Sequence, residues 1–491
     1  MKPFDYDLGI LGGGAAGLTA ASGAARFGAK TLLIEKADKL GGDCLHYGCV
    51  PSKTLIRSAG VMSLARRFPE FGLPEVNLPP VDLGAVMDRV ARVIAKIQAH
   101  DSPERFCRLG AKVSFGAPSF VDPHSVTLNG KVITARTWII ATGSRPAVPP
   151  VEGLTNVPFW TNETVFRQRI VPKRLIVLGG GPIGLELAQA FGRLRASVTV
   201  VEFVDQILGI EDADIAAMLQ DRLIDEGIAF LTGTKAVSAA YEGGIFRLAL
   251  APAAGDGPVR ALEAEAMLVA AGRKPNIEGL NLEAAGVAYT PRGITTDKRL
   301  RTTVKHIYAC GDVNGVMPFT HVAGYEAGIA LSNAVLRLPR SADYERIGWC
   351  TYTDPEVAGL GLNEKAAAAQ GLSCRVIQEA FEDNDRALAE GEAKGKLKLM
   401  LDDKGKLLGV RIIGPHAGEL IHEWVVASSA KVKLSTMAGA VHIYPTLSEI
   451  SKRAAGDYYS DKLFSPRTKE ILRLLFQLKG RACEVPEDSG A

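Results

Sequence analysis

Two stretches of the chain repeat the same order of apolar and polar positions. Each begins with a short apolar run, passes through a glycine cluster into a longer stretch rich in alanine or leucine, and closes with an apolar run ending in glutamate. They are residues 6–36, YDLGILGGGAAGLTAASGAARFGAKTLLIEK, and 174–202, RLIVLGGGPIGLELAQAFGRLRASVTVVE. Short apolar runs bounded by glycine favour strands, and the longer stretch between them has the length of a helix. We therefore predict strand, glycine turn, helix and strand twice.

The glycines of both turns follow the spacing G-x-G-x-x-G. They are Gly12, Gly14 and Gly17 in the first turn, and Gly179, Gly181 and Gly184 in the second. The first glycine of such a set permits a tight turn, the second lets a pyrophosphate approach the backbone, and the third lets the helix pack closely on the strand. The N–H groups of the helix start then face the phosphates. With an acid ending the next strand, Glu35 or Glu202, the pattern predicts two bound dinucleotides.

The second acid also bears on which nicotinamide dinucleotide is used. Glu202 would accept a hydrogen bond from the free 2′-OH of NAD and would repel the 2′-phosphate of NADP. The segment VVEFVDQ offers no arginine for such a phosphate. We therefore expect NAD, with NADP the less favoured alternative; the remaining interpretation of Glu202 is a solvated strand end.

Composition and charge disfavour several functional classes for this protein. The 491 residues, 47% hydrophobic and 23% charged, suffice for three domains of a soluble globular protein. A net charge of +3 without a basic cluster does not favour nucleic-acid binding. The start MKPFDYDLGILGGG lacks the features of a signal peptide, and no run of eighteen apolar residues occurs. Seven cysteines without a disulfide framework fit a reducing compartment. We expect a cytoplasmic protein.

Two of the cysteines, Cys44 and Cys49, lie close together in GGDCLHYGCVPSK, residues 41–53. A zinc site needs about four ligands, and this stretch adds only His46, so we expect no metal. A purely structural disulfide is disfavoured in a cytoplasmic chain. These residues alone do not establish what the pair does.

Together these features resemble the class I pyridine nucleotide-disulfide oxidoreductases, the flavin-dependent family of dihydrolipoamide dehydrogenase, glutathione reductase and mercuric reductase. The resemblance covers roughly residues 5–455 and includes four further segments: IIATGSRP (139–146), VAAGRKPN (269–276), IYACGDV (307–313) and YTDPEVAGLGLNEKAA (352–367). It implies FAD in the first dinucleotide unit and NAD in the second. It assigns four more residues to cofactor binding: Thr142, Gly143, Gly272 and Asp312, the last on the ribityl chain.

The resemblance also implies the architecture. The expected fold is α/β, with two Rossmann-like FAD- and NAD(P)-binding domains and a C-terminal α+β dimerisation domain. The predicted boundaries are 1–150 and 273–345 for the FAD domain, 151–272 for the NAD domain, 346–460 for the dimerisation domain and 461–491 for a helical extension. A homodimer is implied, with an active site shared across the subunits.

By the same resemblance, Cys44 and Cys49 form a redox-active pair. Cys49 would lie against the flavin as the charge-transfer thiolate, and Cys44 would be the more accessible thiol that exchanges with substrate. Lys53 would sit near the flavin N5 and pair with Glu186 on the helix of the NAD domain. We interpret the other cysteines as ordinary small residues: Cys107, Cys310, Cys350, Cys374 and Cys483.

The stretch HIYPTLSEI, residues 442–450, departs from the best-known pattern. Dihydrolipoamide dehydrogenase and glutathione reductase have His-Pro-Thr here, with a glutamate five positions after the histidine base. Glu449 matches that glutamate, but Tyr444 takes the place of the histidine, and His442 lies two residues earlier. In an extended segment His442 would share a face with Tyr444. A phenol is a poor base at neutral pH, but it can donate a hydrogen bond or bind a soft-metal complex.

Three functional hypotheses are compatible with these residues. The favoured one is NAD(H)-linked dithiol–disulfide exchange of the dihydrolipoamide dehydrogenase kind, on a small disulfide or lipoyl-type substrate. The second is mercuric reductase-like reduction of Hg(II) or another thiophilic ion, which the tyrosine favours. The absence from the sequence of a vicinal cysteine pair near the C-terminus and of an N-terminal Cys-x-x-Cys domain weakens it. The third is a flavoprotein subunit recruited to a complex or membrane by its C-terminal helix.

The segment 465–481, SPRTKEILRLLFQLKGR, predicts that helix. Ser465 can cap it and Pro466 suits its first position. Its apolar residues follow helical spacing, and five basic residues accompany them. It could lie on a membrane surface; we favour a helix packed on its own domain or across the dimer.

Overall fold

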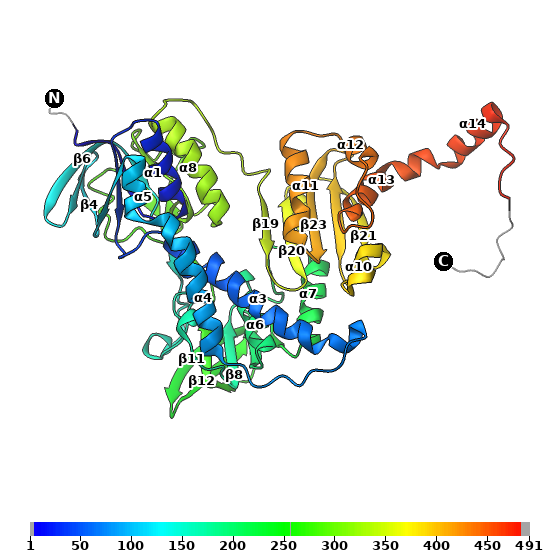
Figure 1. The fold of residues 1–491 in the computed structure, drawn as a ribbon, viewed down its shortest axis with the longest axis horizontal. Helices are drawn as coiled ribbons and strands as arrows, with labels where there is room; N and C mark the ends of the chain where they lie inside the picture. Colours follow the sequence, from blue (N-terminus) through cyan, green and yellow to red (C-terminus); the bar gives the residue numbers. More distant parts are fainter. Residues whose placement is uncertain (1–3, 256, 483–491) are drawn as a thin grey trace. The chain divides into compact units, whose positions relative to one another are not determined.

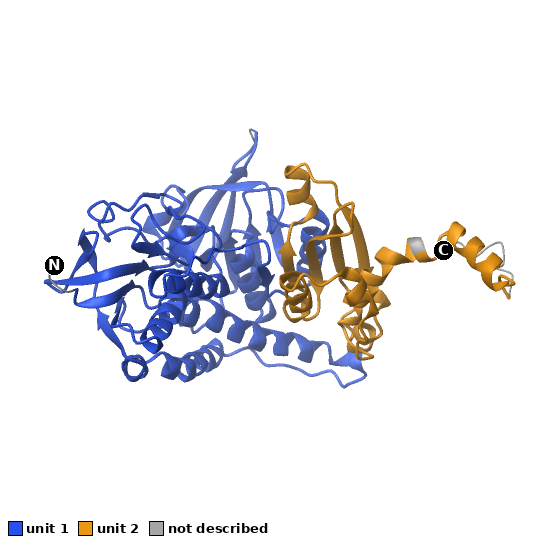
Figure 2. Ribbon diagram, turned by 90° about the horizontal axis from the view of Figure 1, so that it is seen from above, with its two compact units in different colours: residues 1–353 blue, residues 354–491 orange. Residues whose placement is uncertain are grey.

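The structure is a computed structural model that describes residues 4–255 and 257–482. It divides into two compact units, residues 1–353 and 354–491 (Figure 2). The predicted division into FAD, NAD and dimerisation domains with an extension stays a prediction. Among the described residues, no helix is both long enough and apolar enough to cross a membrane.

The first sheet of unit 1 contains the first predicted repeat. Its central strand, β1, pairs in parallel with β2 on one side and with β6 on the other, and β18 runs parallel to β6. In spatial order the strands are β3 (Ala111–Phe115), β2 (Thr31–Glu35), β1 (Tyr6–Leu11), β6 (Lys131–Ile140), β5 (Ser125–Leu128) and β4 (Ser119–Asp122), with β18 (Ile307–Ala309) on β6. The last two strands of this order, β5 and β4, are antiparallel additions.

The central strands β1 and β2 are buried on both faces along most of their length, which explains their mostly apolar sequences. Successive side chains of β1 point to opposite faces, so Ile10 belongs to one core cluster and Leu11 to another. Helices α1 (Ala15–Arg26) and α8 (Thr320–Ala334) lie side by side and contribute alanines to the cluster of Ile10 (Figure 1). This places the start of each helix near one edge of the sheet.

The second sheet of unit 1 contains the second repeat. All of its strand pairs are parallel. The strands are, in order, β10 (Ala229–Leu231), β9 (Ser197–Val201), β8 (Arg174–Leu178) and β14 (Ala266–Val269). Helix α6 (Pro182–Arg193) connects β8 to β9. In both repeats the structure contains the strand, glycine turn, helix and strand that the sequence predicts.

Unit 1 contains further helices and strands outside these two sheets. Helix α3 packs against α4 and α6, which brings the cysteine segment to the second sheet (Figure 1). The helices are α2 (Gly42–His46), α3 (Cys49–Arg66), α4 (Leu83–Gln98), α5 (Pro103–Leu109) and α7 (Ala213–Asp225). The other strands are β7 (Ser144–Pro146), β11 (Thr234–Glu242), β12 (Ile245–Pro252), β13 (Arg260–Ala264), β15 (Arg273–Pro275), β16 (Tyr289–Thr290), β17 (Gly293–Ile294) and β19 (Gly348–Thr351).

Unit 2 combines an antiparallel sheet with helices, the α+β arrangement expected for the C-terminal domain. Its strands pair in the order β20 (Glu356–Gly361), β23 (Leu407–Gly414), β22 (Lys396–Leu401) and β21 (Arg375–Ala380). Its helices are α9 (Glu364–Ala369), α10 (Asp385–Glu390), α11 (Ala417–Ser429), α12 (Leu434–Gly439), α13 (Glu449–Leu463) and α14 (Pro466–Phe476).

The C-terminal helix begins as predicted but differs from its prediction in two other ways. At its start the Ser465 hydroxyl oxygen accepts from the Thr468 N–H at 3.1 Å, and Pro466 is the first helical residue. The helix ends at Phe476, because Gln477 has a φ of 52° in the left-handed region, so it does not continue to 481. None of its residues is buried, so the prediction that it packs on its own domain is wrong.

Candidate active site

The first glycine turn has the geometry that a dinucleotide requires. Gly12 has a φ of +106°, a conformation that side-chain-bearing residues rarely adopt. A Cβ on Gly17 would lie 1.8 Å from the Gly12 carbonyl oxygen, so only glycine lets α1 approach the turn this closely. The N-cap residue of α1 is Gly14, and no side chain caps the helix. Its first N–H groups therefore remain available to an anion.

The second turn repeats these contacts. Gly179 has a φ of +117°, and a Cβ on Gly184 would lie 2.0 Å from the Gly179 carbonyl oxygen. At the middle glycine of each turn the space is open: nothing lies within 4 Å of a Cβ on Gly181, and only the Gly42 Cα, at 3.7 Å, approaches one on Gly14. Both turns therefore leave room for a pyrophosphate against the backbone.

The two strand-end acids bind the glycine turns directly. Glu35 accepts hydrogen bonds from the Gly13 N–H at 2.6 Å and from the Ala37 N–H at 2.8 Å. Glu202 accepts from the Gly180 N–H at 2.5 Å and from the Val204 N–H at 3.0 Å. Each carboxylate oxygen has a second lone pair for a ribose hydroxyl. Glu202 is therefore more than a solvated strand end, because it fixes the turn that would hold the second dinucleotide.

Asp312 lies in a polar network at the edge of the first sheet. It begins a short 3-10 turn, Asp312–Asn314, directly after Gly311. The Ser144 hydroxyl donates to Asp312 at 2.5 Å, and Arg273 Nε donates to the Ser144 oxygen at 2.7 Å. Arg273 Nη2 also lies 3.1 Å from Asp43 Oδ1. One arginine thus joins the Asp312 turn to the cysteine segment, a connection that the sequence did not indicate.

The neighbouring predicted cofactor residues are held by a second network. Thr142 donates through its hydroxyl to the Asn276 carbonyl oxygen at 2.7 Å, and Asn276 Nδ2 donates back to the Thr142 carbonyl oxygen at 2.9 Å. Gly143 and Gly272 have φ values of +68° and +117°. The loops 139–146 and 269–276 are therefore bound to each other, so their positions depend on one another.

A buried carboxyl group, Glu326 on α8, supports the Asp312 turn from behind. Its Oε2 accepts from the Gly311 N–H at 2.6 Å and from Asn314 Nδ2 at 2.8 Å, and its Oε1 accepts from the Tyr344 hydroxyl at 2.5 Å. Burial raises the pKa of Glu326. This residue was not predicted, because a lone glutamate in an alanine-rich helix gives no signal of its role.

The two thiols lie at adjoining helix ends. Cys44 is on α2, and Cys49 is the first residue of the eighteen-residue α3. A thiolate at that position is favoured by the helix dipole. Cys49 is exposed and Cys44 half-buried, the reverse of the predicted order of access. The prediction places the flavin against Cys49, and a flavin in that position would cover this thiol.

The environment separates the pKa values of the two thiols. A hydrogen bond from Cys44, aided by one from the Thr320 hydroxyl and by the charge of Lys53, lowers the pKa of Cys49 to about 6. The Thr320 oxygen lies 3.4 Å from Cys49 Sγ. The same bond to Cys49, together with burial, raises the pKa of Cys44. At neutral pH Cys49 is therefore the thiolate and Cys44 the protonated donor, which supports the predicted division of roles.

We expect the Cys49 thiolate in the reduced protein to titrate near pH 6. Because the pKa is lowered, the thiolate persists at neutral pH and is lost only as the pH falls through about 6. The measurement is the rate of iodoacetamide alkylation against pH, with Cys49→Ser as the control that lacks this component. A single titration in the ordinary thiol range, above pH 8, would contradict the assignment.

The predicted pair of Lys53 and Glu186 is present. Lys53 Nζ, on α3, lies 2.7 Å from Glu186 Oε2, on α6. The other oxygen of Glu186 accepts from the Tyr352 N–H at 2.9 Å, and Lys53 Nζ lies 4.4 Å from the centre of the Tyr352 ring. The Glu186 side chain is nearly buried. The pair thus fixes a positive charge close to the thiols, and Tyr352 is a contact that the sequence did not predict.

In unit 2 the histidine is held by an unpredicted acid. His442 Nε2 donates to Glu423 Oε1 on α11 at 3.0 Å, and its Nδ1 lies 3.3 Å from the Ala440 carbonyl oxygen. Glu449, the expected orienting residue, instead accepts from the Thr446 N–H at 3.4 Å. The orienting contact to His442 therefore comes from α11 and not from Glu449.

Tyr444 has a different partner. Its hydroxyl donates to Asp385 Oδ2 on α10 at 2.8 Å, and this bond raises the pKa of Tyr444. The tyrosine side chain is 67% exposed. A raised pKa keeps the phenol protonated, so Tyr444 is not suited to act as a base at neutral pH. Its one proton is donated to Asp385, which leaves the phenol oxygen as an acceptor.

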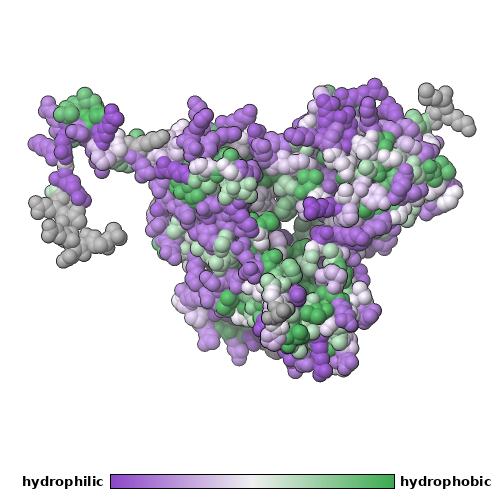
Figure 3. Space-filling model, turned by 180° about the vertical axis from the view of Figure 1, so that it is seen from behind, coloured by the Kyte–Doolittle hydropathy of each residue, from purple (hydrophilic) through white to green (hydrophobic). Residues whose placement is uncertain are grey.

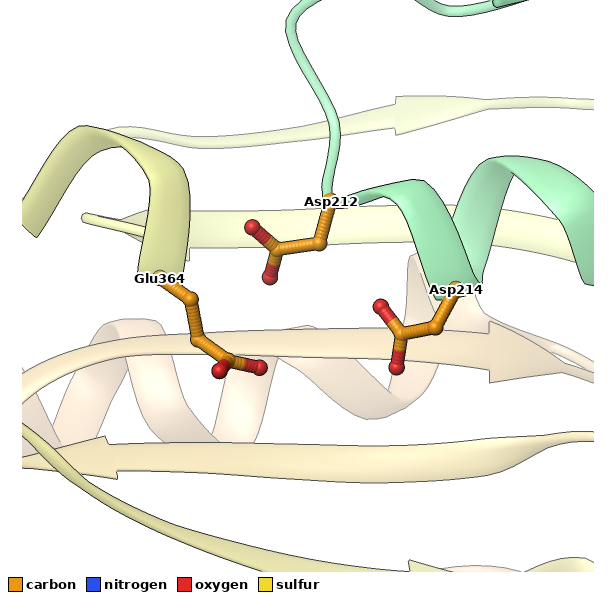
Figure 4. Close-up of side chains that lie close together, drawn as sticks. All are labelled: Asp212, Asp214 and Glu364. Carbon is orange, nitrogen blue, oxygen red and sulfur yellow. The ribbon is translucent and has the colours of Figure 1, made fainter. Parts of the chain in front are cut away.

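Other acidic residues mark helix starts outside this site. Asp212 is the N-cap residue of α7 and Asp214 lies in its first turn (Figure 4). Glu364, labelled in the same figure, begins α9 of unit 2. Carboxylates at these positions are stabilised by the positive end of the helix dipole. The helix ends account for these acids, and we assign no metal to them.

Comparisons with known proteins agree with this geometry. The family described as pyridine nucleotide-disulphide oxidoreductase matches residues 6–327, and its dimerisation domain matches residues 347–455. A mercuric reductase of Staphylococcus aureus is 32% identical over 459 residues, covering 93% of this chain and 83% of its own length. A dihydrolipoyl dehydrogenase of Bacillus subtilis strain 168 is 35% identical over 467 residues, covering 92% and 97%.

Solved structures confirm the predicted α/β fold. The HOCl-induced flavoprotein disulfide reductase RclA from Escherichia coli superimposes with a TM-score of 0.82 at 26% identity, covering 92% of this chain and 99% of that one. LpdA from Mycobacterium tuberculosis gives the same TM-score at 27% identity and the same coverage. The chain therefore belongs to the class I pyridine nucleotide-disulfide oxidoreductases, FAD-dependent enzymes that pass electrons between a pyridine nucleotide and a disulfide.

Proposed function

We propose that this enzyme catalyses NAD(H)-linked dithiol–disulfide exchange of the dihydrolipoamide dehydrogenase kind, on a small disulfide or lipoyl-type substrate. The observation that carries the proposal is the thiol pair: Cys49 has a pKa lowered to about 6 and accepts a hydrogen bond from Cys44, whose pKa is raised. One thiol is thus kept as a thiolate while its neighbour retains a proton, which is the arrangement that stepwise exchange requires.

Reduction of the substrate disulfide begins at Cys44. Its proton leaves along the hydrogen bond to Cys49 or to a second acceptor, and Cys44 attacks one substrate sulfur. The substrate S–S bond breaks, and the released thiolate takes up a proton. Cys49 then attacks Cys44 Sγ, which releases the second substrate sulfur as a thiolate, protonated from solvent, and leaves a Cys44–Cys49 disulfide. Two electrons have passed to the substrate, and FAD, when bound, supplies their replacement from the nicotinamide.

Two further residues of unit 1, Lys53 and Thr320, stabilise the Cys49 thiolate. Lys53, paired with Glu186 at 2.7 Å, contributes positive charge that favours the Cys49 thiolate. Thr320 donates a hydroxyl hydrogen bond to the same sulfur. Both effects lower the free energy of the anion, so Cys49 is the better leaving group when the internal disulfide is opened.

We further propose a homodimer in which the second subunit completes the site. His442, whose Nε2 donates to Glu423, would supply Nδ1 as a proton acceptor for Cys44, and Tyr444, whose proton is donated to Asp385, would offer its phenol oxygen as a hydrogen-bond acceptor. Glu449 would keep the segment 442–446 in place by accepting a hydrogen bond from the Thr446 N–H. The family dimerisation domain at 347–455 supports this arrangement.

For the second dinucleotide we propose NAD. The carboxylate of Glu202 would meet the 2′-phosphate of NADP with like charge, whereas it can accept a hydrogen bond from the 2′-OH of NAD. We also propose a cytoplasmic location, because the spacing of the seven cysteines in the sequence follows no disulfide framework, as suits a reducing compartment.

A second candidate is reduction of a thiophilic metal ion such as Hg(II). Tyr444 favours it, because its exposed phenol is suited to contact a soft-metal complex, and relatives near 32% identity are named mercuric reductases. A Cu(II) complex of the structurally similar RclA is also known. The pair would bind the ion through both sulfurs, and two electrons from the nicotinamide would reduce Hg(II) to the metal.

The test compares both substrates and both nucleotides. We expect purified holoenzyme to turn over lipoamide with NADH, and dihydrolipoamide with NAD, at least about tenfold faster than with the phosphorylated nucleotides, a difference of roughly 1.4 kcal/mol. Reduction of Hg(II)–thiol complexes without lipoamide turnover would replace the disulfide proposal by the metal proposal. A preference for NADPH would overturn the role of Glu202 alone.

A further inference from the structure

The C-terminal helix α14, Pro466–Phe476, presents a broad apolar face that the other described residues of the chain leave exposed. Leu474, Leu475 and Phe476 are 76%, 70% and 67% exposed, and no residue of the helix is buried. Figure 3 shows apolar side chains at this end of unit 2 next to strongly hydrophilic ones. A face of this size is an interaction site or an aggregation hazard in a folded protein.

The length of the helix also indicates that its stability depends on packing against another surface. Its eleven residues fall below the roughly 12–15 at which isolated helices become more than marginal in water. The Ser465 cap and Pro466 define its start, but capping stabilises a helix only modestly. Most of the stability of such a helix comes from burial of its apolar face.

The charges along the segment indicate which kind of surface packs against its apolar face. Residues 465–481 contain a single acid, Glu470, and five basic residues: Arg467, Lys469, Arg473, Lys479 and Arg481. Each copy of this segment has a net charge of +4, from five basic residues and one acid, so bringing two copies together costs electrostatic free energy. An anionic lipid surface is complementary to all five. Three acids follow in the sequence at 484, 487 and 488, beyond the described residues.

We propose that α14 anchors the enzyme to an anionic bilayer surface. The helix would lie in the plane of the interface, with Ile471, Leu474 and Leu475 below the headgroups and its basic residues against lipid phosphates. It takes the place of the prediction that the helix packs on its own domain; packing across the dimer, the other predicted arrangement, is an outcome of the test below. It does not rest on the proposed function, because α14 contributes no residue to the thiol site.

The test is sedimentation of the full-length holoenzyme with vesicles of one part phosphatidylglycerol to three parts phosphatidylcholine, and with pure phosphatidylcholine. We expect binding to the anionic vesicles only, weakening as salt is added. No binding to anionic vesicles at low salt would overturn the proposal. Equal, salt-insensitive binding to both vesicles would overturn the charge argument on which it stands.

Two multiple variants separate the contribution of the apolar side chains to vesicle binding from that of the basic side chains. Leu474→Gln with Leu475→Gln should reduce vesicle partitioning by at least about a hundredfold. Arg467→Gln, Lys469→Gln and Arg473→Gln together should reduce it by about a hundredfold, roughly fivefold for each charge. The control is Ile170→Gln, which removes an 81% exposed apolar side chain in unit 1 and should leave binding unchanged.

Sedimentation velocity and activity complete the test. Both multiple variants should keep wild-type turnover and the wild-type sedimentation coefficient. If the leucine variant instead dissociates the oligomer, a second copy covers α14 and the membrane proposal is wrong.

Discussion

Replacing Cys44 by serine is expected to lower disulfide turnover by at least about 10⁴-fold, or about 5 kcal/mol of transition-state stabilisation. Serine keeps the size and the hydrogen-bond donor of the side chain, but its hydroxyl cannot form the mixed disulfide with the substrate. FAD content and reduction of the flavin by NADH should remain, because the dinucleotide turns are untouched. The measurement is steady-state lipoamide turnover beside stopped-flow flavin reduction by NADH.

The matched control is Cys107→Ser, at an exposed thiol on α5. It should leave both rates at the wild-type value. If Cys44→Ser retains disulfide turnover within about tenfold of wild type, the redox pair is not the exchange site. Loss of flavin reduction as well would mean that the substitution damages more than the exchange step.

Replacing Gly17 by alanine should destabilise the protein by about 3 kcal/mol or more and strip it of FAD. The added methyl group would lie 1.8 Å from the Gly12 carbonyl oxygen, so α1 must move away from the turn. That movement also displaces the N–H groups that face the pyrophosphate. The measurements are flavin content after purification and thermal unfolding with and without added FAD.

Gly328→Ala is the matched control for this substitution. Gly328 lies on α8, which packs beside α1, but nothing lies within 4 Å of its Cβ position. Alanine there removes the helix cost of glycine and should stabilise the protein by up to about 1 kcal/mol. If Gly17→Ala keeps wild-type flavin content and unfolding temperature, the close approach at this turn is not required for FAD binding.

The features that depend on local backbone chemistry could be predicted from the sequence. Gly12 and Gly179 must adopt positive φ values, and Gly17 and Gly184 must leave room for a carbonyl oxygen. Such requirements act within six residues, so their spacing is visible without a structure. The strand–turn–helix–strand repeats followed from them. The family resemblance rested on these repeats together with the cysteine pair and four further segments, and the Lys53–Glu186 pair followed from that resemblance.

The side chains that meet across the chain became visible only in three dimensions. Thr320 reaches Cys49, Arg273 joins Asp43 to the Asp312 turn, and Glu423 rather than Glu449 holds His442. These partners are far apart in sequence, and each is a common polar residue without a distinctive neighbourhood. Their contacts depend on how sheets and helices pack, which no local pattern encodes. The exposure of α14 also became visible only in the tertiary structure, because helical periodicity predicts an apolar face but does not reveal what packs against it.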